Sequence, residues 1–291
     1  MSPIRTALLT ALALAAFAGN SLLCRAALRD TPIDAASFTA IRIASGALVL
    51  WLLVRFRSAR PSRAGSWPSG LALFAYAAAF SFAYLSLTAA TGALLLFGAV
   101  QVTMIGTGVA RGERLLGRQW LGLLLASAGL VGLLMPGLTA PPLRGALLMT
   151  AAGVAWGVYS LRGRTADAGG GDPLAVTAGN FSRAVPMALA LLLAALPWNP
   201  GSGIDMAGTG YALASGAVTS GLGYAVWYTA LRGLKAASAA TVQLSVPVLT
   251  ALAGVVLLAE PLTLRLVLAS AAVLGGIALV IRVSRPDDAR T

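Results

Sequence analysis

The sequence predicts an all-α polytopic membrane protein with ten transmembrane helices. Of its 291 residues, 58% are apolar and 10% are charged, and the mean hydropathy is +0.84. Soluble domains carry about 25% charged residues, so this chain has too few polar side chains to cover a surface in water. A transmembrane helix needs about 20 predominantly apolar residues. Ten apolar runs follow one another, at about 6–24, 35–54, 69–87, 91–110, 119–135, 145–161, 174–196, 208–230, 237–258 and 266–282.

Glycine and proline mark the joints between these runs. Pro61 and Pro68 fall between the second and third runs, and the stretches 136–142, 169–173 and 197–203 separate later ones. Residues of these two types interrupt helices and form turns. Because the joints are short, helices that are neighbours in sequence are expected to pack antiparallel.

Basic residues are unevenly distributed among the joints, and this predicts the orientation. With the N-terminus in the cytoplasm, 15 Lys and Arg residues fall on the cytoplasmic side, and four (Arg25, Arg29, Arg144 and Arg265) on the other. Cytoplasmic loops accumulate such residues. We therefore read the net charge of +12 as topology information rather than as a nucleic-acid site. The sequence predicts a multi-pass protein of the cell inner membrane with both termini cytoplasmic.

Similar residues recur in the two halves of the chain at nearly constant shifts, which predicts an internal repeat. Pro32 and Arg42 are ten residues apart, and so are Pro173 and Arg183, at a shift of 141 residues. Three further sets match in order at shifts of 139, 144 and 147: Phe17 and Ser21 with Trp156 and Ser160; Tyr76, Phe80 and Tyr84 with Ser220, Tyr224 and Tyr228; and Glu113, Arg118 and Gly129 with Glu260, Arg265 and Gly276. Ordered matches of this kind indicate duplication. We expect one repeat at 1–140 and a second at 141–291.

Each expected repeat has five helices, so the two would cross the membrane in opposite directions. Inverted repeats of this kind are typical of secondary transporters. The opening segment also resembles a signal peptide, because Arg5 precedes an apolar run at 7–18. We interpret it as a retained helix, because it is the counterpart of the run at 145–161.

Several of these residues carry a family resemblance that covers nearly the whole chain. The five-plus-five pattern, the sequence Ala-Arg-Gly-Glu-Arg-Leu at 110–115, Leu-Leu-Ala-Glu-Pro-Leu at 257–262 and Pro-Val-Leu-Thr-Ala-Leu at 247–252 resemble EamA-type members of the drug/metabolite transporter superfamily. The first half departs from the pattern, since Val100 stands where the counterpart of Pro247 would be. The resemblance implies export of small metabolites, and the aromatic amino-acid exporter branch is the most similar.

The inventory of reactive residues excludes most catalytic chemistry. The chain has no histidine and one cysteine, Cys24, and its nine acidic residues all lie in joints or at expected helix ends. We therefore expect no catalytic residue, no metal and no cofactor. Without a carboxylate at depth we expect no dedicated proton relay and a neutral or zwitterionic substrate. A sodium site built from backbone carbonyls remains an alternative.

Two aromatic stripes are candidates for a substrate cavity. Tyr76, Phe80 and Tyr84 recur every fourth residue and so share one helix face, as do Ser220, Tyr224 and Tyr228. A buried tyrosine needs a partner for its hydroxyl, which suits a polar cavity wall. A second candidate set is Trp156 and Tyr159 with Phe17 and Asn20. The alternative for all of them is ordinary packing.

Buried amides and prolines form a further candidate group. Gln101 and Gln243 lie in otherwise apolar runs, and Pro247 should free the carbonyl of Gln243 near Ser245. Pro186 should likewise free the carbonyl of Ser182, beside Asn180. Hydrogen bonding between helices is the alternative role for such groups.

Four charged residues, at the second helix and before the last helix of each half, admit more than one interpretation. Arg42 and Arg183 could extend to the membrane surface, bind a substrate carboxylate or anchor gates. Glu113 and Glu260 are expected to cap helices or pair with nearby arginines, with gating as the alternative.

The expected substrate-binding residues are Tyr76, Phe80, Tyr84, Gln101, Trp156, Tyr159, Asn180, Tyr224, Tyr228, Gln243 and Ser245. The expected gating or hinge residues are Pro247, Pro186, Arg42 and Arg183. The sequence thus predicts a monomeric carrier, in a lipid bilayer, that exports neutral and aromatic amino acids or similar small molecules by alternating access. The alternatives are an exporter of drugs or other metabolites, or a non-catalytic accessory subunit.

Overall fold

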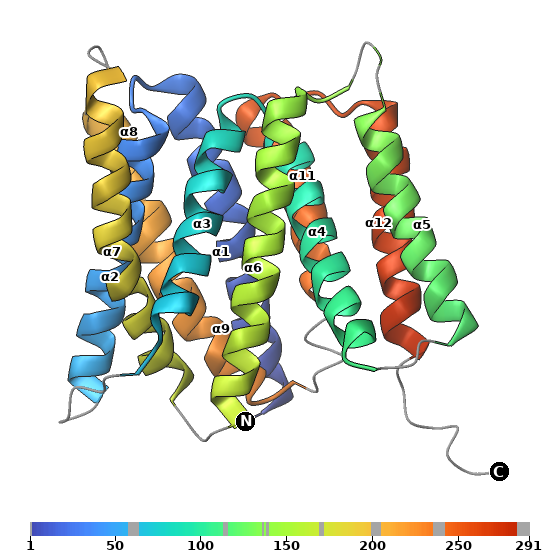
Figure 1. Ribbon diagram of the computed structural model, residues 1–291, viewed down its shortest axis with the longest axis horizontal. Helices are drawn as coiled ribbons and strands as arrows, with labels where there is room; N and C mark the ends of the chain where they lie inside the picture. The colour runs from blue at the N-terminus through green and yellow to red at the C-terminus, as the bar shows by residue number, and fades with distance from the viewer. Residues whose placement is uncertain are drawn as a thin grey trace.

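A computed structural model shows a bundle of long helices whose chain crosses it ten times (Figure 1). The structure describes residues 2–57, 64–112, 116–135, 137, 140–168, 172–198, 205–234 and 242–283, without the side chains of 164–168 and 281–283. The helices are α1 Pro3–Asp30, α2 Ala35–Arg57, α3 Trp67–Tyr84, α4 Ala89–Ala110, α5 Gly117–Leu134, α6 Leu143–Ala168, α7 Pro173–Ala195, η1 Leu196–Trp198, α8 Met206–Leu213, η2 Ala214–Leu222, α9 Gly223–Leu231, α11 Ser245–Leu258 and α12 Leu264–Val283.

The all-helical prediction and the number of crossings are confirmed for the part of the chain described. Five helices, α1, α2, α4, α5 and α7, are long and apolar enough by themselves to cross a membrane. The chain alternates in direction, so α1 begins and α12 ends at the same face (Figure 1). We call this the lower face and the opposite one the upper face, as Figure 1 draws them.

Local sequence signals place several helix starts. Ser66, Thr88 and Asp205 each accept a hydrogen bond from a backbone N–H in the first turn of the following helix. Proline stands in the first turn of α1, α3 and α7, where its missing N–H has no helical partner to lose.

Two crossings differ from the predicted regular helices. The eighth runs through α8, η2 and α9 without interruption, but η2 is a π-helix of nine residues. The ninth was expected as one helix over 237–258, but a turn at Leu244 separates the helical residues Val242 and Gln243 from α11, which begins at Ser245. Pro247 therefore lies in the first turn of α11. Because proline has no N–H to donate, its freeing of the Gln243 carbonyl stays a prediction.

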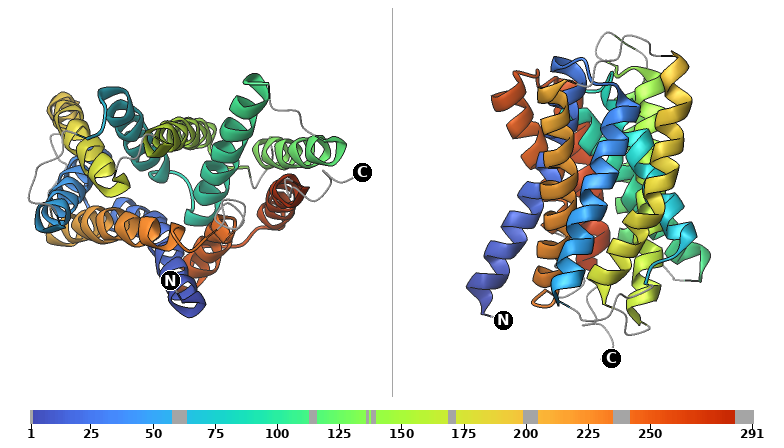
Figure 2. Two further views of the ribbon diagram at one scale, coloured as in Figure 1. Left: turned by 90° about the horizontal axis from the view of Figure 1, so that it is seen from below. Right: turned by 90° about the vertical axis from the view of Figure 1, so that its left-hand side faces the viewer.

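The helices pack in an elongated arrangement (Figure 2). The α2–α7 pair forms one end of the bundle, and the α5–α12 pair forms the other. Between them, α3 and α4 pack on α6, and α1 packs on η2, α9 and α11. The first crossing is thus an integral part of the bundle.

Glycines bring the backbones of α5 and α12 into contact. A methyl group on Gly276 would collide with the carbonyl oxygen of Gly122 and lie 2.7 Å from the backbone nitrogen of Ala126. A methyl on Gly122 would collide with the carbonyl of Gly276 in turn. Small residues commonly allow this approach in membranes. Ala128 and Gly132 of α5 lie outside this contact, because Ala128 is exposed and a methyl on Gly132 meets nothing within 4 Å.

The α5–α12 contact predicts opposite effects for two adjacent glycines. Gly276→Ala should destabilise the protein by about 1–3 kcal/mol through overpacking. Gly275→Ala is the matched control, since its added methyl meets nothing within 4 Å and improves helix propensity by about 1 kcal/mol. Thermal unfolding of the purified variants in detergent measures both. Equal unfolding temperatures would contradict the contact.

Candidate functional site

Aromatic rings from three helices meet inside the bundle. Trp156 of α6 lies with its ring centroid 4.7 Å from that of Tyr76 on α3 and 5.5 Å from that of Tyr224 on α9, stacked on the latter at 17°. Phe80 packs 5.4 Å from Tyr76, and Tyr159 stacks 5.2 Å from Trp156. We call these five rings the central cluster. It draws on both expected repeats, because α3 belongs to the first and α6 and α9 to the second.

The two aromatic sets that the sequence suggested separately are one group in the structure. Phe17 of the second set contacts Tyr224, with centroids 5.9 Å apart. Of the outer members of the stripes, Tyr84 packs edge to face on Phe80, with ring centroids 4.8 Å apart. The hydroxyl of Tyr84 donates to the carbonyl of Ala89, and that of Tyr228 accepts from Thr177. Tyr228 also lines a pocket of about 280 Å³ at the lower ends of α2, α7 and α9.

Arg42 lies against the central cluster. It is seven residues into α2, about 10 Å from the start of the helix, and only 3% exposed. Its Nη2 donates to the Tyr76 hydroxyl at 3.1 Å, and its guanidinium carbon lies 4.9 Å from the Phe80 ring centroid. Its Nη1 is buried without a hydrogen-bond partner. Both ion pairs in the described residues, Arg25–Glu260 and Arg29–Asp30, leave Arg42 without a carboxylate.

Arg183, the sequence counterpart of Arg42, is in a different environment. It is half-buried, and its Nη1 donates to the carbonyls of Ala64 and Gly179 at 2.9 and 2.8 Å. Gly179 is one turn nearer the lower end of α7, so the guanidinium reaches toward that face. This matches the expectation that at least one of the two arginines extends toward a surface. It leaves Arg42 as the arginine of the central cluster.

Asn20 links the central cluster to the π-helix. Its Nδ2 donates to the Tyr76 hydroxyl at 3.3 Å, and its Oδ1 accepts from Ser215 at 2.7 Å and from Thr219 at 3.4 Å. Both hydroxyl groups come from η2. π-Helical segments are rare and occur frequently at functional sites. The sequence placed Asn20 beside Phe17 but did not predict η2; its only signal is a run rich in small residues, with Gly216 and Gly221.

The predicted glutamines lie away from the described contacts of the cluster. Gln101 is buried on α4, one turn beyond Phe97, which packs on Leu14, Ala18 and Val246. Gln243 and Ser245 are half-buried at the start of α11, and the Ser245 hydroxyl donates to the carbonyl of Val242. Their role in binding stays a prediction.

The residues expected around Pro186 lie on different faces of α7. Ser182 and Pro186 are exposed, whereas Asn180 is buried and its Oδ1 accepts the backbone N–H of Ser66 at 2.9 Å. Asn180 thus fastens α7 to the segment before α3 at the lower face. It does not share one polar site with the carbonyl that Pro186 frees.

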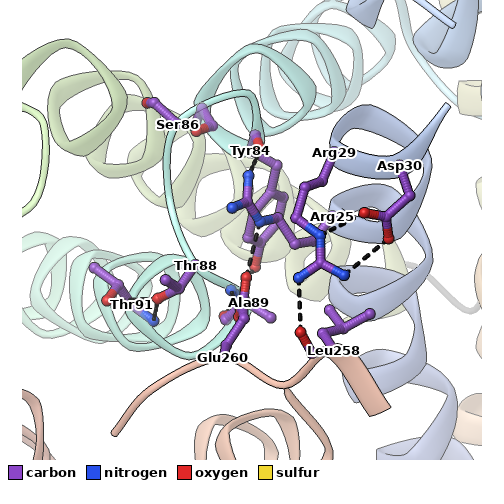
Figure 3. Close-up of polar contacts among 11 residues, drawn as sticks. Arg25, Arg29, Asp30, Tyr84, Ser86, Thr88, Ala89, Thr91, Leu258 and Glu260 are labelled. Carbon is purple, nitrogen blue, oxygen red and sulfur yellow. Dashed lines mark hydrogen bonds and ion pairs between the residues drawn. The ribbon is translucent and has the colours of Figure 1, made fainter. Parts of the chain in front are cut away.

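Glu260 organises the upper face (Figure 3). Its Oε1 accepts from Nε of Arg25 at 2.8 Å, and its Oε2 accepts the backbone N–H of Ala89 at 2.7 Å. Arg25 also donates to the carbonyl of Tyr84 at 2.9 Å. Ala89 begins α4, and a helix N-terminus favours an anion. We call these contacts the Glu260 network; they join α1, α3 and α4 to the segment after α11.

The structure agrees with the expected pairing and capping role of Glu260 and identifies its partner. The sequence could not have chosen Arg25 over Arg265, which lies five residues from Glu260 but donates to the carbonyl of Met135. The left-handed conformation of Ala259, at φ 50°, turns the chain before Glu260. Glu113, its sequence counterpart, lies outside the described residues.

Removal of the Tyr76 hydroxyl should reveal its role as the acceptor for both Asn20 and Arg42. Tyr76→Phe leaves two buried donors without this acceptor and should cost about 1–3 kcal/mol of stability. Tyr211→Phe, on α8 outside the cluster, is the control and should change it little. Thermal unfolding in detergent is the measurement, and equal stability of the two variants would contradict this arrangement.

Comparison with known proteins gives a family match and a similar fold. The model of the EamA-like transporter family matches residues 143–282, the stretch from α6 to α12. A solved crystal structure superposes with a TM-score of 0.67 at 20% identity, over 98% of this chain and 100% of that one. This second similarity concerns the fold alone.

Two relatives are similar in sequence. "Uncharacterized protein PA1977" of Pseudomonas aeruginosa is 62% identical over 279 residues, 95% of this chain and 94% of its own length. An "Uncharacterized transporter" of Archaeoglobus fulgidus is 50% identical over 60 residues, 21% of this chain and 22% of its own length. The second half of the chain, residues 143–282, thus matches the EamA-like transporter family.

Proposed function

We propose that the protein is a carrier of the cell inner membrane that exports small neutral or zwitterionic metabolites, with aromatic and neutral amino acids as its substrates. The observation that supports this most strongly is the central cluster, in which both halves of a chain from a transporter family contribute rings to one buried group. Flat aromatic faces favour aromatic side chains, which pack on them offset or edge to face. Asn20, Ser215 and Thr219 add hydroxyl and amide groups beside the rings.

The packing of the helices supports two inverted five-helix repeats at 1–140 and 141–291. If crossings one to five correspond to six to ten, each contact has a counterpart on exchange of the halves. The α3–α6 contact then matches α1–α9, α4–α6 matches α1–α11, and α3–α7 matches α2–η2. The α2–α7, α4–α11 and α5–α12 pairs match themselves. Such symmetry gives two packings of similar energy, which alternating access requires.

The distribution of charge supports a cytoplasmic lower face. Arg25, Arg29, Arg144 and Arg265 lie at the upper ends of their helices, whereas Arg55, Arg57, Arg111, Arg118, Arg162 and Arg232 lie at lower ends. Positive residues collect on the cytoplasmic side. Both termini would then be cytoplasmic, and the Glu260 network would lie on the external side.

In this proposal the Glu260 network is the external gate. It fastens elements of both halves to one another through a carboxylate that is 6% exposed. Opening toward the outside requires the Arg25 and Ala89 bonds to break.

Counterflow in proteoliposomes that contain only this protein tests the proposed activity. Internal phenylalanine or leucine should drive uptake of the labelled amino acid, with and without a pH gradient. Trp156→Ala should raise the half-saturation concentration for phenylalanine about tenfold, because stacking on the ring is lost. Trp120→Ala, a 46% exposed tryptophan, is the matched control. Flux of drugs or other metabolites without amino acids would replace the substrate assignment, and no flux of any compound would favour an accessory subunit.

The single cysteine provides a test of the gate. Cys24 is 0% exposed and adjoins Arg25. Glu260→Gln removes the ion pair and should favour opening, so that an impermeant maleimide labels Cys24 from the external side about tenfold faster. Asp30→Asn removes the other described ion pair and is the matched control. Unchanged labelling in Glu260→Gln would exclude the network as a gate.

A further inference from the structure

We infer that Arg42 binds the carboxylate group of the substrate, so that the ligands of the central cluster are monocarboxylates with an apolar, preferably aromatic, body. This inference rests on the proposed function and adds the group that the substrate must carry. It separates Arg42 from Arg183, which the sequence could not do. An ammonium group on the ligand is then tolerated but not required.

The charge of Arg42 is not balanced by a described carboxylate. Arg42 is 3% exposed, and the described acids in its own half, Asp30 and Asp34, lie at the upper ends of α1 and α2. Asp34 caps its own helix, since its oxygens accept from Ala36 and Ser37. An arginine inside a membrane bundle is costly and usually marks a substrate pathway or pairs with another group. The rings and one hydroxyl around Arg42 offset part of that cost, and an anionic ligand would supply the missing counter-charge.

The Arg42 guanidinium retains hydrogen-bond donors that a carboxylate could use. A guanidinium has five N–H groups in a fixed planar fork that fits a carboxylate through two parallel bonds. Nη1 of Arg42 has no partner, and Nη2 uses one bond to reach Tyr76. Nη1 and Nη2 together therefore retain donors for both carboxylate oxygens. The Tyr76 hydroxyl accepts from Asn20 and Arg42, so its own proton remains available to the same carboxylate.

Aromatic rings lie beside the donors of Arg42. The guanidinium carbon is 5.3 Å from the Tyr76 ring centroid and 4.9 Å from that of Phe80, and Trp156 adjoins Tyr76. If the carboxylate of a ligand takes the place of these rings beside the guanidinium, the apolar body of that ligand lies among the rings of the central cluster. One guanidinium among aromatic rings suits one negative charge. Dicarboxylates and phosphate esters would leave a charge unmatched in the apolar site.

A ligand series on the full wild-type chain provides the first test. The probes are 3-phenylpropionate, which has the ring and carboxylate, phenethylamine, which has the ring and ammonium, and phenylalanine, which has all three. Thermal shift and quenching of tryptophan fluorescence in nanodiscs measure binding without transport. We expect 3-phenylpropionate and phenylalanine to bind and phenethylamine to bind about 10- to 100-fold more weakly. Equal binding of phenethylamine and 3-phenylpropionate would overturn the inference.

Variants show which residue produces the preference for 3-phenylpropionate over phenethylamine. Arg42→Met, which keeps the apolar stem, should lose the preference for 3-phenylpropionate over phenethylamine, and Arg42→Lys should recover part of it. Arg183→Met tests the rival arginine, and Arg144→Met tests an exposed one; both should keep the preference. Loss of the preference in Arg183→Met with Arg42→Met unaffected would overturn the assignment. If Arg42→Met does not fold, Arg42→Lys and the wild-type series still decide.

The outcomes separate this inference from the proposed function. Counterflow of amino acids with no effect of Arg42→Lys or Arg42→Met on carboxylate preference would contradict the inference and keep the carrier. Arg42-dependent binding of 3-phenylpropionate without amino-acid counterflow would keep the binding site and contradict amino-acid export.

Discussion

A positive charge held within an apolar bundle is the constraint around which the interior of this protein is arranged. The Arg42 guanidinium is bonded to the Tyr76 hydroxyl, and that hydroxyl is bonded to Asn20, which reaches the hydroxyl groups of the π-helix η2. A methyl group on Gly216 in η2 would collide with the carbonyl of Arg42, so the backbones of η2 and α2 are in close contact at this point. The widened helix, the tyrosine and the aromatic rings therefore surround one cation.

The charges of the described residues have different partners according to depth. At the upper face, Arg25 and Glu260 neutralise each other, and the carboxylate also takes the first N–H of α4. At the lower face, Arg183 is bonded to backbone carbonyls. At the centre, the described neighbours of Arg42 are the rings of Tyr76 and Phe80 and the Tyr76 hydroxyl. In the proposed carrier, the upper end, where Arg25 and Glu260 are paired, would close the pathway. The centre, where Arg42 lacks a counter-charge, would bind the substrate.

Much of the fold could be predicted from composition and periodicity, because apolar length and short joints dictate where helices cross a bilayer. The residues of the central cluster were also predictable, since tyrosines every fourth residue share a face. Their mutual contacts were not: which face of α6 meets α3 depends on tertiary packing. Tertiary packing also decides that Glu260 pairs with Arg25. The π-helix and the turn at Leu244 escaped prediction because small residues and a proline do not specify local geometry by themselves.

The most direct measurement of the central claim is the position of an iodinated ligand in an electron-density or cryo-electron-microscopy map. The structure of the full chain is determined in complex with 3-(4-iodophenyl)propionate, whose iodine atom and carboxylate mark the two ends of the ligand. The account predicts the carboxylate against Nη1 of Arg42 and the iodinated ring among Tyr76, Phe80 and Trp156. Density for the carboxylate at Arg183, or for the ligand only on the outer surface of the bundle, would contradict it.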